Sequence, residues 1–259
     1  MTEGYGERVF SHGGDTELDR LRALAGALDE GSFRRLARLP LREDWRCLDI
    51  GAGLGTVTRW LAGRCPRGRV VAADRDTRLL SAQDGPWETT EMDVTRDDFP
   101  DGSFDLIHAR WLFAHLPSRA AVLGRVVRWL APGGWLVIED LARFPLESSP
   151  HPVYRKVSLA ICAAVISRIG TDPAWARTFP APLRALGLTD LGTETLLPQV
   201  GPTPMGRFWR RSGEQLATDL RDDFDVTDAE LAEFVELAES PDFTDLCLAT
   251  VAAWGRRPE

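Results

Sequence analysis

Eight residues near the start of the chain, Asp49-Ile50-Gly51-Ala52-Gly53-Leu54-Gly55-Thr56, carry glycines at three alternate positions. They overlap the short apolar segment 47–50, which is typical of a buried β-strand. Glycines let a backbone turn sharply and approach a ligand closely, and the helix expected over 56–62 offers the positive end of its dipole. The segment therefore predicts a strand, a tight turn and a helix. A turn of this kind that binds no ligand is the alternative, and the loop alone does not exclude it.

Strand and helix patterns alternate from residue 46 to residue 140. The expected strands are 47–50, 69–73, 88–92, 104–108 and 135–139. Ser118 is expected to cap a helix that runs toward the turn Pro132-Gly133-Gly134. Strands that alternate with helices at this spacing predict an α/β fold with a mostly parallel sheet covered by helices on both faces.

The regions on either side of this core read as mainly helical. Asp15 or Thr16 can cap a first helix that Gly31 ends, and Ser32 can cap a second short helix that closes at Pro40. After residue 140 we expect an apolar helix over 153–169, a strand over 191–197, a helix over 205–220, a helix with the capping box Thr227 and Glu230, and a closing strand over 246–254.

These patterns predict one domain over residues 1–259 with seven strands. We divide it into an N-terminal helical lid (1–45), a ligand-binding core (46–140), a helical cap inserted between strands five and six (141–188), and the final strands and helices (189–259). Ligands of open α/β sheets bind outside the carboxyl ends of the strands. The cap and the N-terminal helices are therefore expected to form a lid over an apolar pocket there.

Composition excludes several classes of partner. The chain has 31 Lys and Arg residues against 39 Asp and Glu residues and a net charge of −8, so a nucleic-acid surface is not expected. Its four cysteines form no C-x-x-C pair, which favours free thiols in a reducing compartment. The start Met1–Tyr5 has no secretory pattern, and the apolar part of 153–169 is too short to span a membrane. We expect a cytoplasmic protein.

Two carboxylates follow the glycine loop at positions where strands end. Asp74 closes the second strand, and a carboxylate there can accept hydrogen bonds from both hydroxyls of a ribose. Asp93 follows the third strand and could accept a hydrogen bond from an adenine amino group. Each has an ordinary alternative, a helix cap for Asp74 and an exposed loop acid for Asp93. A nicotinamide dinucleotide is disfavoured, because the pattern is G-x-G-x-G and Thr56 stands where the G-x-G-x-x-G motif needs glycine.

The order of these segments resembles the class I S-adenosylmethionine-dependent methyltransferases, which have a Rossmann-like fold, and among them the ubiquinone/menaquinone-biosynthesis-like group. The segments that carry the resemblance are 48–55, Val71-Ala72-Ala73-Asp74, Asp93-Val94, 104–110, His115-Leu116-Pro117 and 130–134, and the closing segment 254–258 also looks like this group. The resemblance covers residues 46–140 well, whereas the N-terminal segment and the insertion agree with it only in placement.

The resemblance implies that the chain transfers a methyl group from S-adenosyl-L-methionine to a small-molecule acceptor by in-line attack on the sulfonium, with alignment as the enzyme's main contribution. The cofactor-binding residues it implies are Asp49, Gly51, Ala52, Gly53 and Gly55 for the methionine end, Asp74 and Arg75 at the ribose, Asp93 and Val94 at the adenine, and Ala109 and Arg110 beside the sulfonium. A protein of the same fold that binds the cofactor without methyl transfer, such as a cyclase or a regulatory protein, is the alternative function. We expect a monomer or a homodimer.

The remaining candidates concern the acceptor. Trp111, just past the fourth strand, and Asp140, at the end of the fifth, are expected to face the substrate with His115. Histidine titrates near neutrality, so His115 is the candidate general base, although it could equally hydrogen-bond a turn backbone. His108 ends a buried strand and reads as a hydrogen-bonded core histidine. No two of the four histidines have the spacing of a helical metal pair, so no metal is expected.

Overall fold

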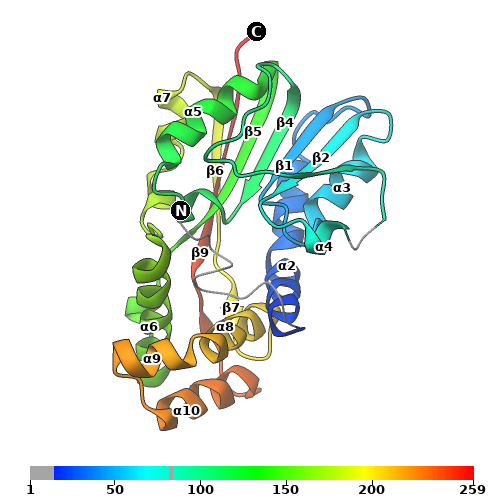
Figure 1. The fold of residues 1–259 in the computed structure, drawn as a ribbon. Coiled ribbons are helices and arrows are strands. Elements are labelled where there is room, and N and C mark those ends of the chain that lie inside the picture. Colours follow the sequence, from blue (N-terminus) through cyan, green and yellow to red (C-terminus); the bar gives the residue numbers. More distant parts are fainter. Residues whose placement is uncertain (1–14, 82–83) are drawn as a thin grey trace. The chain divides into compact units, whose positions relative to one another are not determined.

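The structure is a computed structural model that describes residues 15–81 and 84–259 (Figure 1). Two compact units divide the chain. The sheet unit contains residues 29–141, 174–195 and 250–259, and the helical unit contains the described residues up to Leu28 together with 142–173 and 196–249. The N-terminal peptide Met1–Tyr5, His12 and the side chain of Asp15, a candidate cap, lie outside the described part of the chain.

The sheet unit is built on a seven-stranded sheet in the order β3-β2-β1-β4-β5-β9-β6 (Figure 1). The strands are β1 (Arg46–Ile50), β2 (Arg69–Asp74), β3 (Glu88–Glu91), β4 (Phe104–Arg110), β5 (Leu130–Ala142), β6 (Thr189–Leu196) and β9 (Ala249–Arg256). The pairs β2–β3, β1–β2, β1–β4 and β4–β5 are parallel. This confirms the predicted α/β fold, with its seven-stranded and mostly parallel Rossmann-like sheet.

The order of the strands reverses at β1. From β1 the chain proceeds outward through β2 and β3, and β4 then returns to pair with the other edge of β1. β1 is therefore the topological switch point of this sheet. Ligands of open α/β sheets bind at such a switch point.

Helices cover both faces of the sheet. The helices of this unit are the second half of α2 (Asp15–Leu36), α3 (Thr56–Arg64), α4 (Arg78–Ser81), α5 (Arg119–Trp129) and α7 (Ala181–Ala185), with the 3₁₀ helices η1 (Phe113–His115) and η3 (Trp175–Thr178). Successive strand residues point to opposite faces. Cys47, Leu106 and Val137 accordingly pack with α2 and α3, while Leu48, Ile107 and Leu136 pack with α5.

The helical unit is held by contacts among its helices. These are α6 (Pro152–Ile169), α8 (Pro204–Gln215), α9 (Ala217–Phe224) and α10 (Asp228–Glu239), with η2 (Leu146–Ser148), the antiparallel pair β7 (Gln199–Val200) and β8 (Asp245–Leu246), and the first half of α2. Tyr154 of α6 is buried against the rings of Phe234 and Phe243. The predicted capping box of Thr227 and Glu230 is confirmed. No helix in the described residues is apolar over a length that could span a bilayer.

The prediction of two N-terminal helices is wrong. One helix, α2, runs from Asp15 to Leu36 and passes through Gly31 without a break. Ser32 lies inside α2 and so does not cap a second helix; its hydroxyl donates a hydrogen bond to Glu139 at 3.0 Å. A glycine inside a helix costs about 1 kcal/mol relative to alanine, which tertiary contacts of this kind readily offset.

Other local predictions also need correction. Ser118 precedes α5 but makes no capping hydrogen bond with its side chain. The segment 132–134 is not a free turn, because β5 runs through it and pairs with the chain end through Gly133 N–H to Arg257 O at 3.0 Å. The helix expected over 205–220 divides at Leu216 into α8 and α9. The closing strand divides into β8 and β9. The expected role of residues 141–188 as a lid stays a prediction.

Candidate functional site

The glycine loop connects β1 to α3 at the switch point. Gly51, Gly53 and Gly55 have φ angles of 68°, 54° and 67°. In this left-handed region of the backbone, any residue with a side chain would be strained. The N–H groups of Gly51 and Ala52 both donate to the carbonyl of Ala73 in β2, at 2.8 and 3.2 Å. A Cβ on Gly55 would approach the side chain of Leu80 to 2.9 Å, whereas a Cβ on Gly53 would meet no heavy atom within 4 Å. The loop is thus packed at Gly55 and open at Gly53.

Asp74, at the end of β2, is bonded to this loop. Its Oδ2 accepts the N–H of Gly53 at 2.8 Å, and its Oδ1 accepts the N–H of Asp76 at 3.1 Å. Asp74 is half-buried, and its carboxylate presents oxygen acceptors at the carboxyl end of β2. Sequence reasoning placed Asp74 at the site, and the structure adds that it also fixes the loop.

Asp93 lies just beyond β3, the strand that pairs with β2. Its Oδ1 accepts the N–H of Thr95 at 2.9 Å and the hydroxyl of Thr95 at 2.6 Å. Partial burial would raise the pKa of this carboxyl, but the bonds from Thr95 and the charges of Arg75 and Arg96 hold it below its usual value. Asp93 is therefore an ionised acceptor just beyond the carboxyl end of β3. The next residue, Val94, is buried.

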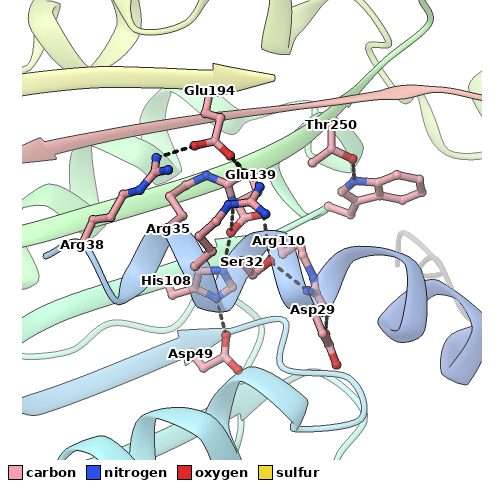
Figure 2. Close-up of polar contacts among 12 residues, drawn as sticks. Asp29, Ser32, Arg35, Arg38, Asp49, His108, Arg110, Glu139, Glu194 and Thr250 are labelled. Carbon is pink, nitrogen blue, oxygen red and sulfur yellow. Dashed lines mark hydrogen bonds and ion pairs between the residues drawn. The ribbon is translucent and has the colours of Figure 1, made fainter. Parts of the chain in front are cut away.

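One face of the central strands changes from apolar to polar toward the carboxyl ends. In the register of the sheet, Asp49 stands opposite His108, and Glu139 stands opposite Arg110. Because side chains alternate, these four residues share the face of Cys47, Leu106 and Val137. Figure 2 shows Asp49, His108 and Glu139 directed toward one another, whereas Arg110 is directed toward Ser32 and Asp29 of α2.

His108 joins two buried carboxylates. Its Nδ1 lies 2.8 Å from Asp49 Oδ1 and its Nε2 lies 3.4 Å from Glu139 Oε1, with the ring 1% exposed. The hydroxyl of Thr58 donates to the other oxygen of Asp49 at 2.7 Å. Burial alone would lower the pKa of His108, but the two carboxylates raise it above its usual value. The expectation of a hydrogen-bonded core histidine is confirmed, with the ring lying between two carboxylates.

Glu139 connects this pair to α2. Arg35 forms an ion pair with Glu139 at 3.0 Å, and Ser32 donates to its other oxygen (Figure 2). Burial would raise the pKa of Glu139, but the bond from His108 and the charges of His108, Arg35 and Arg110 lower it to about 2. Glu194 of β6 in turn pairs with Arg35 at 3.4 Å. We call the set Asp49, His108, Glu139, Ser32 and Arg35 the buried relay.

Arg110 makes a second connection between α2 and the loop. Its guanidinium donates to Asp29 at 2.9 Å and to Ser32 at 3.0 Å, and Asp29 also accepts the hydroxyl of Thr56 at 2.9 Å. Sequence reasoning named Arg110 but missed Asp29, Ser32 and Arg35. A signal was present, since these three residues recur at intervals of three and so lie on one face of a helix.

The segment after β4 holds the candidates for the acceptor. Trp111 adopts a φ of 51°, and its N–H donates to Glu139 O at 2.7 Å while its indole N–H donates to Thr250 at 3.1 Å. His115 closes the 3₁₀ helix η1 and is half-buried. Positive φ is costly for a bulky residue and is maintained only where surrounding bonds determine it. The structure therefore gives Trp111 one fixed place at the edge of the site.

Asp140 lies under η1. It is 1% exposed, and its Oδ2 accepts the N–H of Ala114 at 2.9 Å. Burial raises the pKa of Asp140 to about 7, although bonds from the backbone oppose this. In this structure Asp140 supports the turn that carries His115. Of the other expected site residues, Ala109 is buried within β4 and Arg75 is exposed.

Within residues 15–81 and 84–259, no three His, Cys, Asp or Glu side chains form a group that could hold a metal ion.

Comparison with known proteins identifies the core. Residues 48–138, from β1 to β5, match the model of a family described as a methyltransferase domain. The matched segment encloses the glycine loop, Asp74, Asp93 and the residues Trp111 and His115, so the site described above lies almost wholly within it.

Several named proteins are similar in sequence to parts of this chain. The chain is 31% identical over 128 residues to methyltransferase str3 of Strobilurus tenacellus, covering 49% of this chain and 46% of that protein. It is 31% identical over 146 residues to trans-aconitate 2-methyltransferase of Methylobacterium nodulans, covering 52% of this chain and 56% of that protein. The chain thus spans about half the length of these curated relatives.

Solved structures share the fold. The YcgJ protein from Bacillus subtilis superposes with a TM-score of 0.61 at 16% identity, covering 89% of this chain and 99% of that one. A phosphoethanolamine N-methyltransferase 2 of Haemonchus contortus, solved with S-adenosylhomocysteine, superposes with a TM-score of 0.55 at 17% identity, covering 98% of this chain and 55% of that one. At these identities the likeness is one of fold.

Proposed function

We propose that this chain is a class I methyltransferase that transfers a methyl group from S-adenosylmethionine to a small-molecule acceptor. The observation that carries the proposal is the open glycine loop at the switch point of the sheet, bonded to Asp74 and followed along the sheet edge by Asp93. The match of residues 48–138 to a methyltransferase domain supports it. We place the protein in the ubiquinone/menaquinone-biosynthesis-like group and expect it to act in the cytoplasm as a monomer or a homodimer.

The residues of the site fit this cofactor. The open side of Gly53 leaves room for a close approach to the backbone. Asp74 and Asp93 offer carboxylate acceptors, to ribose hydroxyls and to an adenine amino group respectively. Asp49, at the end of β1, is the acceptor assigned to the methionine end, next to Gly51 and Ala52. Ala109 and Arg110 end β4, the strand beside β1, where the sulfonium would pass.

Bound S-adenosylmethionine supplies a methyl group on a sulfonium, which is already a strong electrophile for in-line attack. The protein's own residues then have two tasks. The loop and the carboxylates fix one reactant, and Trp111 with the η1 segment aligns the acceptor, which removes the entropic cost of bringing two molecules together. Where the acceptor must lose a proton, the imidazole of His115 accepts it.

Cofactor binding is the first test of the proposal. Titration calorimetry should show that the protein binds S-adenosylmethionine and S-adenosylhomocysteine and does not bind NAD, because the G-x-G-x-G loop and Asp74 suit an adenosyl group joined to an amino acid. Binding of NAD without binding of S-adenosylmethionine would overturn the proposal. Turnover of the cofactor to S-adenosylhomocysteine with an acceptor separates a transferase from a protein that only binds the cofactor.

The second test concerns Asp74. Asp74→Ala should weaken cofactor binding by on the order of 2 kcal/mol, roughly thirtyfold, because the ribose loses a charged acceptor. Asp76→Ala is the matched control, since the Asp76 carboxylate pairs with Arg78. Calorimetry on both folded variants measures the difference. Equal affinities in the two variants would refute the role of Asp74.

A further inference from the structure

The geometry points to His108 as a positioning residue for the cofactor site: its imidazole fixes the Asp49 carboxylate, and through it the start of the glycine loop, while its opposite edge is held by Glu139. This inference rests on the proposed function, because Asp49 is assigned there to the methionine end of the cofactor. It adds a residue that does not contact the cofactor, and it couples the site to α2 through the buried relay.

Two buried donors hold the Asp49 carboxylate. Asp49 is the last residue but one of β1, immediately before the loop, and only 2% of it is exposed. Its two oxygens accept from His108 at 2.8 Å and from Thr58 at 2.7 Å. A carboxylate has about four lone-pair directions, so two donors fix its orientation and leave two directions for others. His108 and Thr58 therefore determine which way the remaining acceptor directions of Asp49 point.

His108 is itself held at both nitrogens of its ring. It stands directly opposite Asp49 in the parallel pair of β1 and β4, so the bond between them is a cross-strand contact at the switch point. The ring is held at both ends, since Nε2 lies 3.4 Å from Glu139, and Glu139 is held by Arg35 and Ser32 of α2. An imidazole bonded at both nitrogens has one orientation. A residue held in this way can in turn orient a residue of the binding site, here Asp49.

Two substitutions can separate the two bonds of His108. The amide nitrogen of asparagine is attached where Nδ1 is attached in histidine, so His108→Asn keeps a donor toward Asp49 and gives up the contact with Glu139. Glutamine places its amide nitrogen near Nε2, so His108→Gln keeps a donor toward Glu139 and gives up the bond to Asp49. Both variants are neutral, and any difference between them reports on the individual bonds.

The experiment measures the Kd for S-adenosylmethionine of the full chain by calorimetry, with the melting temperature of each variant. His108→Gln should raise the Kd about tenfold, the effect of losing one hydrogen bond to a charged group, and His108→Asn should stay within about threefold of the wild type. Both should melt at a lower temperature, since each loses a buried contact. A purely structural histidine would lower the melting temperature of both variants without this order of affinities.

A second variant keeps the inference testable if the His108 variants do not fold. Thr58→Val preserves the shape of Thr58 and removes the other donor on Asp49, so it should also raise the Kd by about three- to tenfold. Equal Kd values for His108→Gln and His108→Asn, or an unchanged Kd in folded Thr58→Val, would overturn the inference while leaving the proposed function intact. A wild-type protein that does not bind S-adenosylmethionine would overturn both.

Discussion

Glu139→Ala should destabilise the sheet unit by about 3 to 5 kcal/mol, the typical cost of removing one partner from a buried ion pair. Glu139 is 2% exposed, and its carboxylate contacts two buried groups, the ring of His108 and the guanidinium of Arg35. Its removal takes a negative partner from Arg35 and a hydrogen-bond partner from His108, in a region where water cannot replace them. In a chain of this length, that loss corresponds to a fall in melting temperature of roughly 10 °C, which scanning calorimetry measures.

A matched control is available in the same set of charges. Glu194→Ala also removes a carboxylate from Arg35, but the side chain of Glu194 is 22% exposed and its other partners, Arg34 and Arg38, are exposed. That variant should cost about 1 kcal/mol or less. Similar losses in the two variants would contradict the view that Glu139 is the carboxylate on which the buried relay depends.

The lowered pKa of Glu139 also predicts how the stability of the protein changes at acid pH. The pKa of Glu139 is about 2 in the folded protein against an ordinary value of 4.5. A carboxyl whose pKa is lowered by folding contributes stability above its unfolded pKa and loses it as the pH falls toward its folded pKa. The contribution of Glu139 is therefore complete above about pH 5 and declines between about pH 4.5 and pH 2. Glu139→Gln should flatten this part of the stability curve relative to the wild type.

His115→Ala should reduce turnover by at least about a hundredfold while the affinity for S-adenosylmethionine stays the same. A general base contributes typically 10²–10⁴-fold, and removing it affects the proton transfer but not the cofactor contacts. The position of His115 at the end of η1, after the β4 strand end, motivates the role. Initial rates at saturating cofactor, with calorimetry for the affinity, provide the two measurements.

The control for His115 is His151→Ala. His151 precedes α6 in the helical unit, where its ring packs against Phe243, so turnover should be close to that of the wild type. A reduction of only a few fold in His115→Ala would mean that this position aligns the acceptor and does not remove its proton. The next residues to test would then be Glu139 and Asp140. Asp140 has a pKa near 7, but it acts from beneath η1 through its bond to Ala114.

The local features of this protein could be predicted from the sequence because they depend on short segments. The turn from β1 to α3 needs glycines at three left-handed positions, and these are visible as Gly51, Gly53 and Gly55. Apolar runs alternating with helix patterns are sufficient to indicate a parallel sheet. Asp74 was predictable for the same reason, since its place depends only on where one strand ends.

The buried relay was decided by the tertiary structure. Asp49, His108 and Glu139 come from three strands, and they meet only because the register sets Asp49 opposite His108 while β5 brings Glu139 alongside. Nothing in a single segment fixes that register. The same dependence applies at Gly31, where α2 continues past the residue at which local signals would end it and Ser32 contacts Glu139 of β5.

Cys47 and Cys65 show the same division. The sequence determines that they form no C-x-x-C pair, and their apolar neighbours predict two buried thiols, which the structure confirms. Only the packing of α3 against β1 places their sulfur atoms 3.6 Å apart. Local chemistry thus selected strands, turns and helices, because it acts between neighbours in the chain. Pairings between distant polar groups followed from strand register and helix packing, which minimise the burial of unpaired charge over the whole unit.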